Sequence, residues 1–144
     1  MNAWSDRSRT NLDTCHFDLQ RLFNEVLIHR DCSIICGHRG REEQERLLHM
    51  EPPRTQLSYP NSRHSCSPSD AVDVIPYPFN GWNDLHAFYQ FGTFVLHLAY
   101  RMSIPLDWGG HWAGFRDYPH YELREENEEE DIKQMRNASP ARWS

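Results

Sequence analysis

The chain has 144 residues, enough for one domain with a core that needs no disulfides. Only 38% of the residues are hydrophobic, and the formal net charge is −6. No stripe of basic residues accompanies this charge, so we expect no nucleic-acid partner. The N-terminal residues lack the apolar segment of a signal peptide, and polar residues interrupt the longest apolar segment, residues 88–102. We therefore expect no membrane insertion and a protein that is made in the cytoplasm.

The four cysteines lack the paired spacing of a structural zinc site. Cys32 and Cys36 fall in one predicted strand, where they would lie about 13 Å apart, too far for a disulfide. Free thiols are therefore the expected state. A structural zinc site or a disulfide framework is the less favoured alternative.

Apolar periodicity, glycine and proline together predict the helices and strands in the first half of the chain. Apolar residues recur every three or four positions after Asp13 and Thr14, either of which can cap a helix. A short apolar run that ends at Gly37 predicts a buried strand, and two prolines stop the polar helix that follows. The predicted elements are a helix over about 17–27, a strand over Cys32–Cys36, a helix from about Arg41 to Met50, and an extended loop over 52–69.

The second half of the chain alternates strands with one long helix. Ala71 begins a strand that Pro76 closes, and Asn80-Gly81 turns the chain into a helix with a broad apolar face. The order of elements predicts an α+β domain with a small antiparallel sheet and packed helices. The predicted elements are a strand over 71–75, a helix from Trp82 to about Met102, a strand from Ile104 to Trp108, a turn at Gly109-Gly110, and a strand over His120–Leu123.

Composition divides the chain into residues 1–124, the folded domain, and residues 125–144, an acidic and polar C-terminal tail. The tail has too little apolar surface to fold alone. Ile132, Met135 and Trp143 could nevertheless dock on the domain.

His64, Asp73 and His120 have the chemistry of a catalytic zinc site. Such a site takes about three protein ligands from His, Asp or Glu and leaves one position open for water. Asp73 lies within an apolar strand, and alternation places it on the face opposite Val72 and Val74. A buried carboxylate without a charged partner is costly there. A metal ion would offset this cost, and an arginine or loop amides are the alternative partners.

Asp117-Tyr118-Pro119-His120 adds a further carboxylate to this set. Alternation along the predicted strand places His120 and Glu122 on one face, with Asp117 nearby. A carboxylate beside the metal can take a proton from water, so Asp117 is the candidate base and Glu122 the next. An exposed turn with a surface histidine is the alternative interpretation.

Four motifs, in the same order, resemble those of the zinc D-Ala-D-Ala carboxypeptidase/L-alanyl-D-glutamate peptidase family, and most of all its phage endolysin branch. The resemblance runs from about Leu12 to Leu123. The spacing from His64 to Asp73 is longer than in commoner members, and His111 stands where an acidic residue is frequent. The motifs are Cys36-Gly37-His38-Arg39 with Gln44, Ser62-Arg63-His64 with Ala71-Val72-Asp73, Trp108-Gly109-Gly110 with Trp112, and Asp117 with His120.

The resemblance implies a hedgehog/D,D-peptidase-like fold and a role for each matched residue. It makes His64, Asp73 and His120 the ligands of Zn²⁺, Asp117 the catalytic base, and Arg39 the group that stabilises the oxyanion. A salt bridge to Glu42, Glu43 or Glu45 is the alternative for the arginine. The candidate substrate-binding residues are Gln44, Ser62, Trp112 and Tyr118.

Each candidate substrate-binding residue also has an alternative, structural interpretation. Gln44 could instead cap the sheet, and Ser62 could hold the loop that carries the first histidine. Trp112 and Tyr118 could belong to the core rather than to a peptide groove. A contribution of His111 or His38 to the site is also open.

The resemblance implies a zinc-dependent endolysin that cleaves the stem peptide of bacterial peptidoglycan, at the L-alanyl-D-glutamate bond, and so lyses the host cell. It would then have antimicrobial action. A D,D-carboxypeptidase that trims D-alanine and a non-catalytic, zinc-stabilised wall-binding module are the alternatives. Asp117 and Arg39 favour an enzyme over the module. We expect a monomer that leaves the host cytoplasm through a holin-type pore or travels as a virion component.

Overall fold

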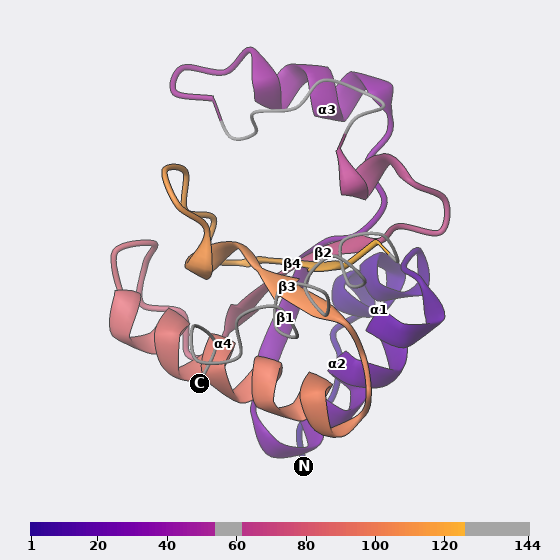
Figure 1. The fold of residues 1–144 in the computed structure, drawn as a ribbon, viewed down its shortest axis with the longest axis vertical. Coiled ribbons are helices and arrows are strands. Elements are labelled where there is room, and N and C mark those ends of the chain that lie inside the picture. Colours follow the sequence, from indigo (N-terminus) through magenta and orange to yellow (C-terminus); the bar gives the residue numbers. More distant parts are fainter. Residues whose placement is uncertain (54–61, 126–144) are drawn as a thin grey trace, which may run out of the picture.

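The structure is a computed structural model that describes residues 1–53 and 62–125 (Figure 1). Four helices surround a four-stranded sheet, which confirms the predicted α+β class. The elements are α1 (Asp6–Asp13), α2 (Phe17–His29), β1 (Cys32–Cys36), α3 (Arg41–Leu48), β2 (Ala71–Pro76), α4 (Leu85–Arg101), β3 (Leu106–Trp108) and β4 (His120–Leu123), with short 3-10 helices at Arg63–Ser65 and Gly109–His111.

The strands form an antiparallel sheet in the order β1-β2-β4-β3. In β2, Val72 and Val74 are fully buried in the core, so the intervening Asp73 projects from the opposite face. In β4, Tyr121 joins the core and His120 projects from the opposite face. Asp73 and His120 are register partners, so the pairing of β2 with β4 places them side by side.

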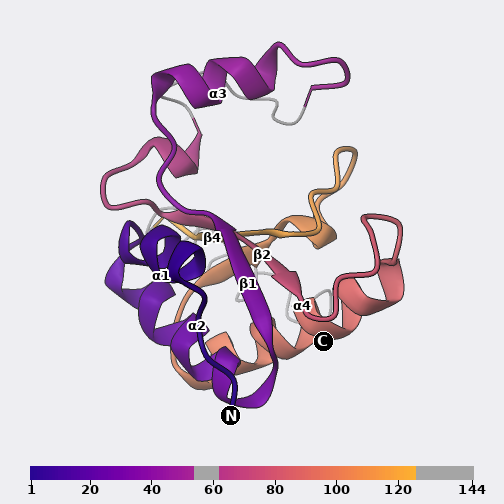
Figure 2. The ribbon, with the colours of Figure 1, turned by 180° about the vertical axis from the view of Figure 1, so that it is seen from behind.

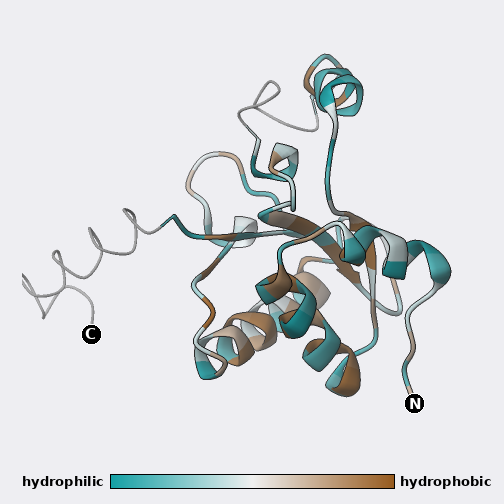
Figure 3. Cartoon of the chain, turned by 90° about the vertical axis from the view of Figure 1, so that its right-hand side faces the viewer, coloured by the Kyte–Doolittle hydropathy of each residue, from teal (hydrophilic) through white to brown (hydrophobic). Residues whose placement is uncertain are grey.

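Helices α2 and α4 lie on one side of the sheet, and α3 stands on the other side (Figure 1 and Figure 2). The core fills the space between the sheet and helices α2 and α4. Phe23 of α2 and Phe91 of α4 both contact the ring of Tyr121. Figure 3 shows hydrophobic residues along the strands of the sheet and in parts of these helices. Burying one large apolar side chain in this way stabilises the fold by about 1.5–3 kcal/mol.

The structure contains a helix that apolar periodicity does not reveal. In α1 only Ser8 and Leu12 are buried, and the helix packs against β1. Tertiary contact therefore stabilises a segment too short and polar to be a stable helix alone.

Several element ends differ from the predicted ones. His16 caps α2 through its Nδ1, which accepts the Asp18 N–H, whereas Thr14 ends α1, so the predicted caps are wrong. Asp84 caps α4, which begins three residues later than predicted. The other differences are the end of α3 at Leu48, the start of β3 at Leu106, and a 3-10 helix in place of the Gly109-Gly110 turn.

Part of the predicted loop over 52–69 is a 3-10 helix that carries His64. Residues 54–61 and 126–144, and with them the proposed docking residues Ile132, Met135 and Trp143, lie outside the described residues. The four cysteines are free thiols. Of the described helices, none combines the length and apolar character needed to cross a bilayer.

Candidate metal centre and its cleft

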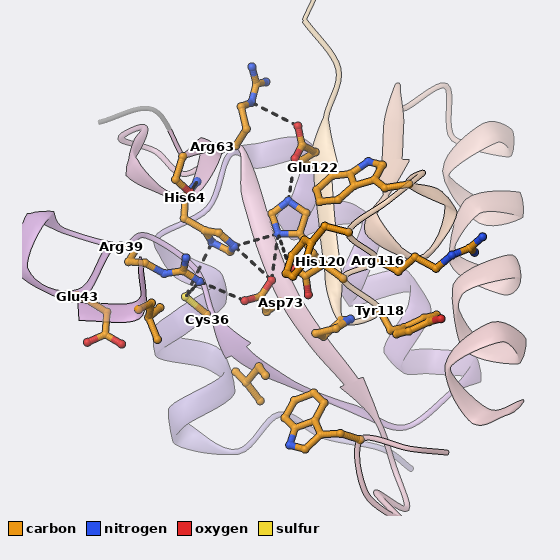
Figure 4. Close-up of a pocket in the computed structure, with 18 of the residues that line it drawn as sticks. Cys36, Arg39, Glu43, Arg63, His64, Asp73, Arg116, Tyr118, His120 and Glu122 are labelled. Atoms are coloured by element: carbon orange, nitrogen blue, oxygen red, sulfur yellow. Dashed lines mark hydrogen bonds and ion pairs between the residues drawn. The ribbon is translucent and has the colours of Figure 1, made fainter. Parts of the chain in front are cut away.

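Three side chains from separate parts of the chain meet on the face of the sheet opposite the core (Figure 4). The His64 Nε2, Asp73 Oδ1 and His120 Nδ1 atoms lie 3.2 Å from one another in each pairing. Two imidazole nitrogens and a carboxylate oxygen are typical zinc ligands. In a tetrahedral site with ligands at about 2.0–2.1 Å from the ion, two ligand atoms lie about 3.3 Å apart. The observed triangle therefore fits one face of a zinc tetrahedron.

Hydrogen bonds turn both imidazoles toward this triangle. His64 Nδ1 lies 2.8 Å from the Gly37 carbonyl oxygen, and His120 Nε2 lies 2.8 Å from Glu122 Oε1. Each imidazole can donate a proton from that nitrogen and present the other nitrogen to a metal. Glu122, which the sequence predicted only as a second candidate base, thus orients the imidazole of His120. A backbone carbonyl such as that of Gly37 leaves no signal in the sequence.

Asp73 is the electrostatic centre of the cluster. Burial alone would raise its pKa, but His64 and His120 hold the pKa of the Asp73 carboxyl well below its usual value. Burial alone would likewise lower the pKa of His64, but the Asp73 carboxylate raises it to about 10. Protons on the imidazoles therefore balance this carboxylate, and a metal cation would replace them.

Asp117 stands beside the triangle, with its Oδ2 3.9 Å from His120 Nδ1. Burial, and next the negative charge of Asp73, raise the pKa of Asp117 to about 6. A carboxylate that titrates near neutral pH can accept a proton and give it back during one reaction. The geometry therefore allows the predicted role as a base.

The Trp108-Gly109 pair holds the segment that carries this carboxylate. The Asp117 N–H donates to the Gly109 carbonyl over 3.0 Å, and a Cβ added at Gly109 would lie 2.3 Å from the Asp117 carbonyl oxygen. Only glycine permits this approach. The Trp108 indole N–H donates to the Tyr118 carbonyl over 2.7 Å. The motif therefore positions the candidate base.

Arg39 reaches the cluster from the segment between β1 and α3 and is 6% exposed. Its guanidinium lies 3.3 Å from Asp73 Oδ2 and 3.4 Å from the Cys36 sulfur, and donates to Gln44 Oε1 over 2.9 Å. Gln44 is fully buried and positions the guanidinium. Of the glutamates considered as alternative partners, Glu43 instead forms a 2.7 Å ion pair with Arg46.

The other candidate substrate-binding residues differ in what they contact. The Ser62 hydroxyl accepts the His64 N–H over 3.2 Å and so caps the 3-10 helix, in agreement with the alternative of a loop-holding residue. Trp112 and Tyr118 line the same cavity as the cluster, and the Trp112 ring lies 5.0 Å from that of His120. A direct contact of any of them with substrate stays a prediction.

His111 and His38, whose contribution to the site the sequence left open, do not line the cavity. The His111 ring packs on Trp108 with a centroid distance of 4.8 Å, and His38 Nδ1 lies 2.9 Å from the Cys66 carbonyl oxygen. Cys36, by contrast, lines the cavity, with its sulfur 3.8 Å from His64 Nδ1. The sequence predicts Cys36 as a free thiol and as the first residue of a matched motif, and it gives this residue no role at the site.

The cluster opens into a cavity of about 800 Å³. Figure 4 shows Arg39 and Glu43 on one side of it and Arg116 and Tyr118 on the other. The cavity is large enough for an extended peptide substrate. A buried His-Asp-His triangle with a carboxylate and a guanidinium, at the base of such a cleft, defines the protein as a hydrolase with a candidate metal centre.

Comparisons with known proteins show to which kind of hydrolase the chain belongs. The chain matches the phage L-alanyl-D-glutamate peptidase family over residues 2–131 and belongs to that family. It is also similar to the crystal structure of the Serratia marcescens L-Ala D-Glu endopeptidase ChiX, with 28% sequence identity and a TM-score of 0.67. That match covers 84% of this chain and 89% of the other. No curated protein matches the chain.

The match to the family extends past residue 124 into the acidic segment. The division of the chain at residue 124 therefore stays a prediction.

Proposed function

We propose that this protein is a zinc-dependent endolysin that hydrolyses the L-alanyl-D-glutamate bond in the stem peptide of bacterial peptidoglycan. The observation that carries the proposal is the triangle of His64, Asp73 and His120 donor atoms, each 3.2 Å from the other two. Membership of the phage L-alanyl-D-glutamate peptidase family supports the bond and the substrate.

The chemistry of the site follows from groups around the triangle. Zinc held by His64, Asp73 and His120 would supply a Lewis acid that polarises the scissile carbonyl and lowers the pKa of water. Asp117 takes a proton from the attacking water and passes it to the leaving amine. Arg39, held in place by Gln44, stabilises the negative charge that develops on the carbonyl oxygen.

The place of action follows from the substrate. Peptidoglycan lies outside the cytoplasmic membrane, so we propose that the enzyme reaches it as a monomer after release from the host cytoplasm or from a virion. The same activity would give the protein an antimicrobial effect on cells whose wall is accessible.

Mass spectrometry of purified peptidoglycan after digestion tests the proposal. The zinc-loaded protein should release fragments with a new N-terminal D-glutamate, and a chelator should abolish their release. Free D-alanine as the product would assign the activity of a D,D-carboxypeptidase. Binding to the wall without any product would instead indicate a wall-binding module.

A further inference from the structure

A row of aromatic rings, Phe79, Trp82, Phe88 and Tyr118, leads from the surface to the candidate metal centre. Phe79 meets Trp82 edge-on at a centroid distance of 5.0 Å, and Trp82 stacks on Phe88 at 6.0 Å with 8° between the planes. Phe88 then lies 6.0 Å from Tyr118, which directly follows Asp117. Phe79, Trp82 and Phe88 have no role in the proposed chemistry.

The outer end of the aromatic row is open to solvent. Trp82 is 50% exposed and Phe79 is 40% exposed, whereas Phe88 beneath them is buried. Trp82, Phe88 and Tyr118 line the same cavity as the metal cluster. Trp82 is therefore an exposed part of the cleft wall with Phe79 against it, and Phe88 holds the indole in a defined plane.

The residues next to the exposed rings in the sequence are neutral or acidic, and the arginines that line the cavity come from other segments. Asn80 follows Phe79, Asn83 and Asp84 follow Trp82, and no lysine or arginine occurs between residues 71 and 100. An anionic membrane surface attracts basic residues, so it fits this patch poorly. Rings flanked by amides suit a sugar, whose C–H face can stack on an aromatic ring while its hydroxyl and acetamido groups form hydrogen bonds.

The substrate carries a sugar a short distance from the bond that is cleaved. L-alanine is joined through a lactyl group to an amino sugar of the glycan strand, so about two extended units separate the scissile bond from the sugar. At about 3.5 Å for each unit, this distance is about 7 Å. We propose that Trp82 and Phe79 form a subsite for the amino sugar that carries the stem peptide, an inference that rests on the proposed function.

A pair of matched substrates tests the subsite. One is the stem peptide linked to N-acetylmuramic acid, and the other is the same peptide with an acetyl group on its alanine. In the wild type, the sugar should raise kcat/KM. The Trp82→Ala substitution should lower the ratio of the two kcat/KM values about tenfold, which corresponds to about 1.4 kcal/mol. Trp82→Phe keeps a ring and should restore most of this ratio.

Tyr100→Ala is the matched control, because Tyr100 is an exposed aromatic residue at the far end of α4 and does not line the cavity. This variant should keep the wild-type ratio. A Trp82→Ala variant that is folded and cleaves both substrates at the wild-type ratio would overturn the subsite and leave the proposed function standing.

Binding of peptide-free glycan strands provides a readout that does not depend on catalysis. In NMR spectra, the indole N–H signal of Trp82, identified by its loss in Trp82→Phe, should shift on addition of the strands. The signal of Trp108, which is 2% exposed, should not. If neither substrate is cleaved and the Trp82 signal still shifts, the proposed function fails and the sugar subsite stands. An unchanged Trp82 signal counts against the subsite.

Discussion

Asp73 contacts two imidazoles through one carboxylate oxygen and Arg39 through the other. The sequence left a metal ion and an arginine as alternative partners for this buried carboxylate. The structure shows that they are compatible, because the two oxygens face different groups. At the residue scale, the arginine therefore leaves room for a metal at the triangle of donor atoms.

Replacing one ligand should abolish metal binding and activity together. His120→Ala removes one of the three donors and leaves Asp73 with fewer partners, so the variant should bind no zinc at stoichiometric concentration. Metal content measured by atomic absorption, together with the hydrolysis assay, checks this. His97→Ala, an exposed histidine on α4, is the control. Full zinc occupancy in a folded His120→Ala protein would contradict the ligand assignment.

Asp117 should be needed for turnover and not for metal binding. Asp117→Asn keeps the shape of the side chain but cannot take up a proton, so kcat should fall roughly 10²–10⁴-fold while zinc stays bound. Steady-state kinetics and metal analysis of one preparation separate the two properties. Asp13→Asn, at an exposed position in α1, should have wild-type activity. Half of the wild-type activity in Asp117→Asn would move the base elsewhere, with Glu122 the next candidate.

At the scale of elements, the contact between α4 and β3 holds the loop that carries the base. The Trp108 indole lies against Gly92 of α4, where an added Cβ would come within 2.6 Å of the ring. The same indole donates to the Tyr118 carbonyl. Close packing of a helix on a strand is thus linked to the position of Asp117.

Gly92→Ala should therefore destabilise the protein in spite of the higher helix propensity of alanine. The propensity gain is about 1 kcal/mol, whereas overpacking a rigid ring costs about 1–3 kcal/mol and would displace the indole. Thermal unfolding should show a lower Tm, and kcat should fall as the Tyr118 contact weakens. Thr93→Ala, at the next and exposed position of α4, should change Tm little. A Gly92→Ala protein at least as stable as wild type would refute this account.

At the scale of the whole molecule, the candidate metal centre and the residues that orient it lie within residues 1–53 and 62–125. The last of these residues is Glu122, and Arg63 joins the ligand-bearing loop to the end of β4 through Glu122, the Leu123 carbonyl and Glu125. The described chain ends just after these contacts.

Deletion of residues 126–144 should leave hydrolysis of purified peptidoglycan nearly intact for each folded molecule. The deletion keeps Glu125 and every residue of the metal cluster, and the removed segment is polar and acidic. If Ile132, Met135 and Trp143 cover part of the sheet, Tm should fall by several degrees without a change in kcat. A truncated protein that is folded and zinc-loaded but unable to cut the wall would show that the tail takes part in substrate recognition.

The sequence by itself was sufficient for the features that depend on neighbouring residues. Period-2 alternation correctly placed Asp73 and His120 on the face opposite the core, and β1 and β4 have the predicted bounds. The residue types of the His64, Asp73 and His120 triangle could also be read from the sequence, because ligand chemistry belongs to the side chain itself.

Tertiary structure decided whatever depends on contacts between distant segments. The polar helix α1 exists because it packs on β1, and the orientation of His64 depends on a carbonyl 27 positions away in the chain. The choice of Asp73 over the glutamates as the partner of Arg39 likewise follows from the fold. Such contacts could not be predicted here, because the free energy that selects them comes from burial and pairing that exist only once the chain has folded.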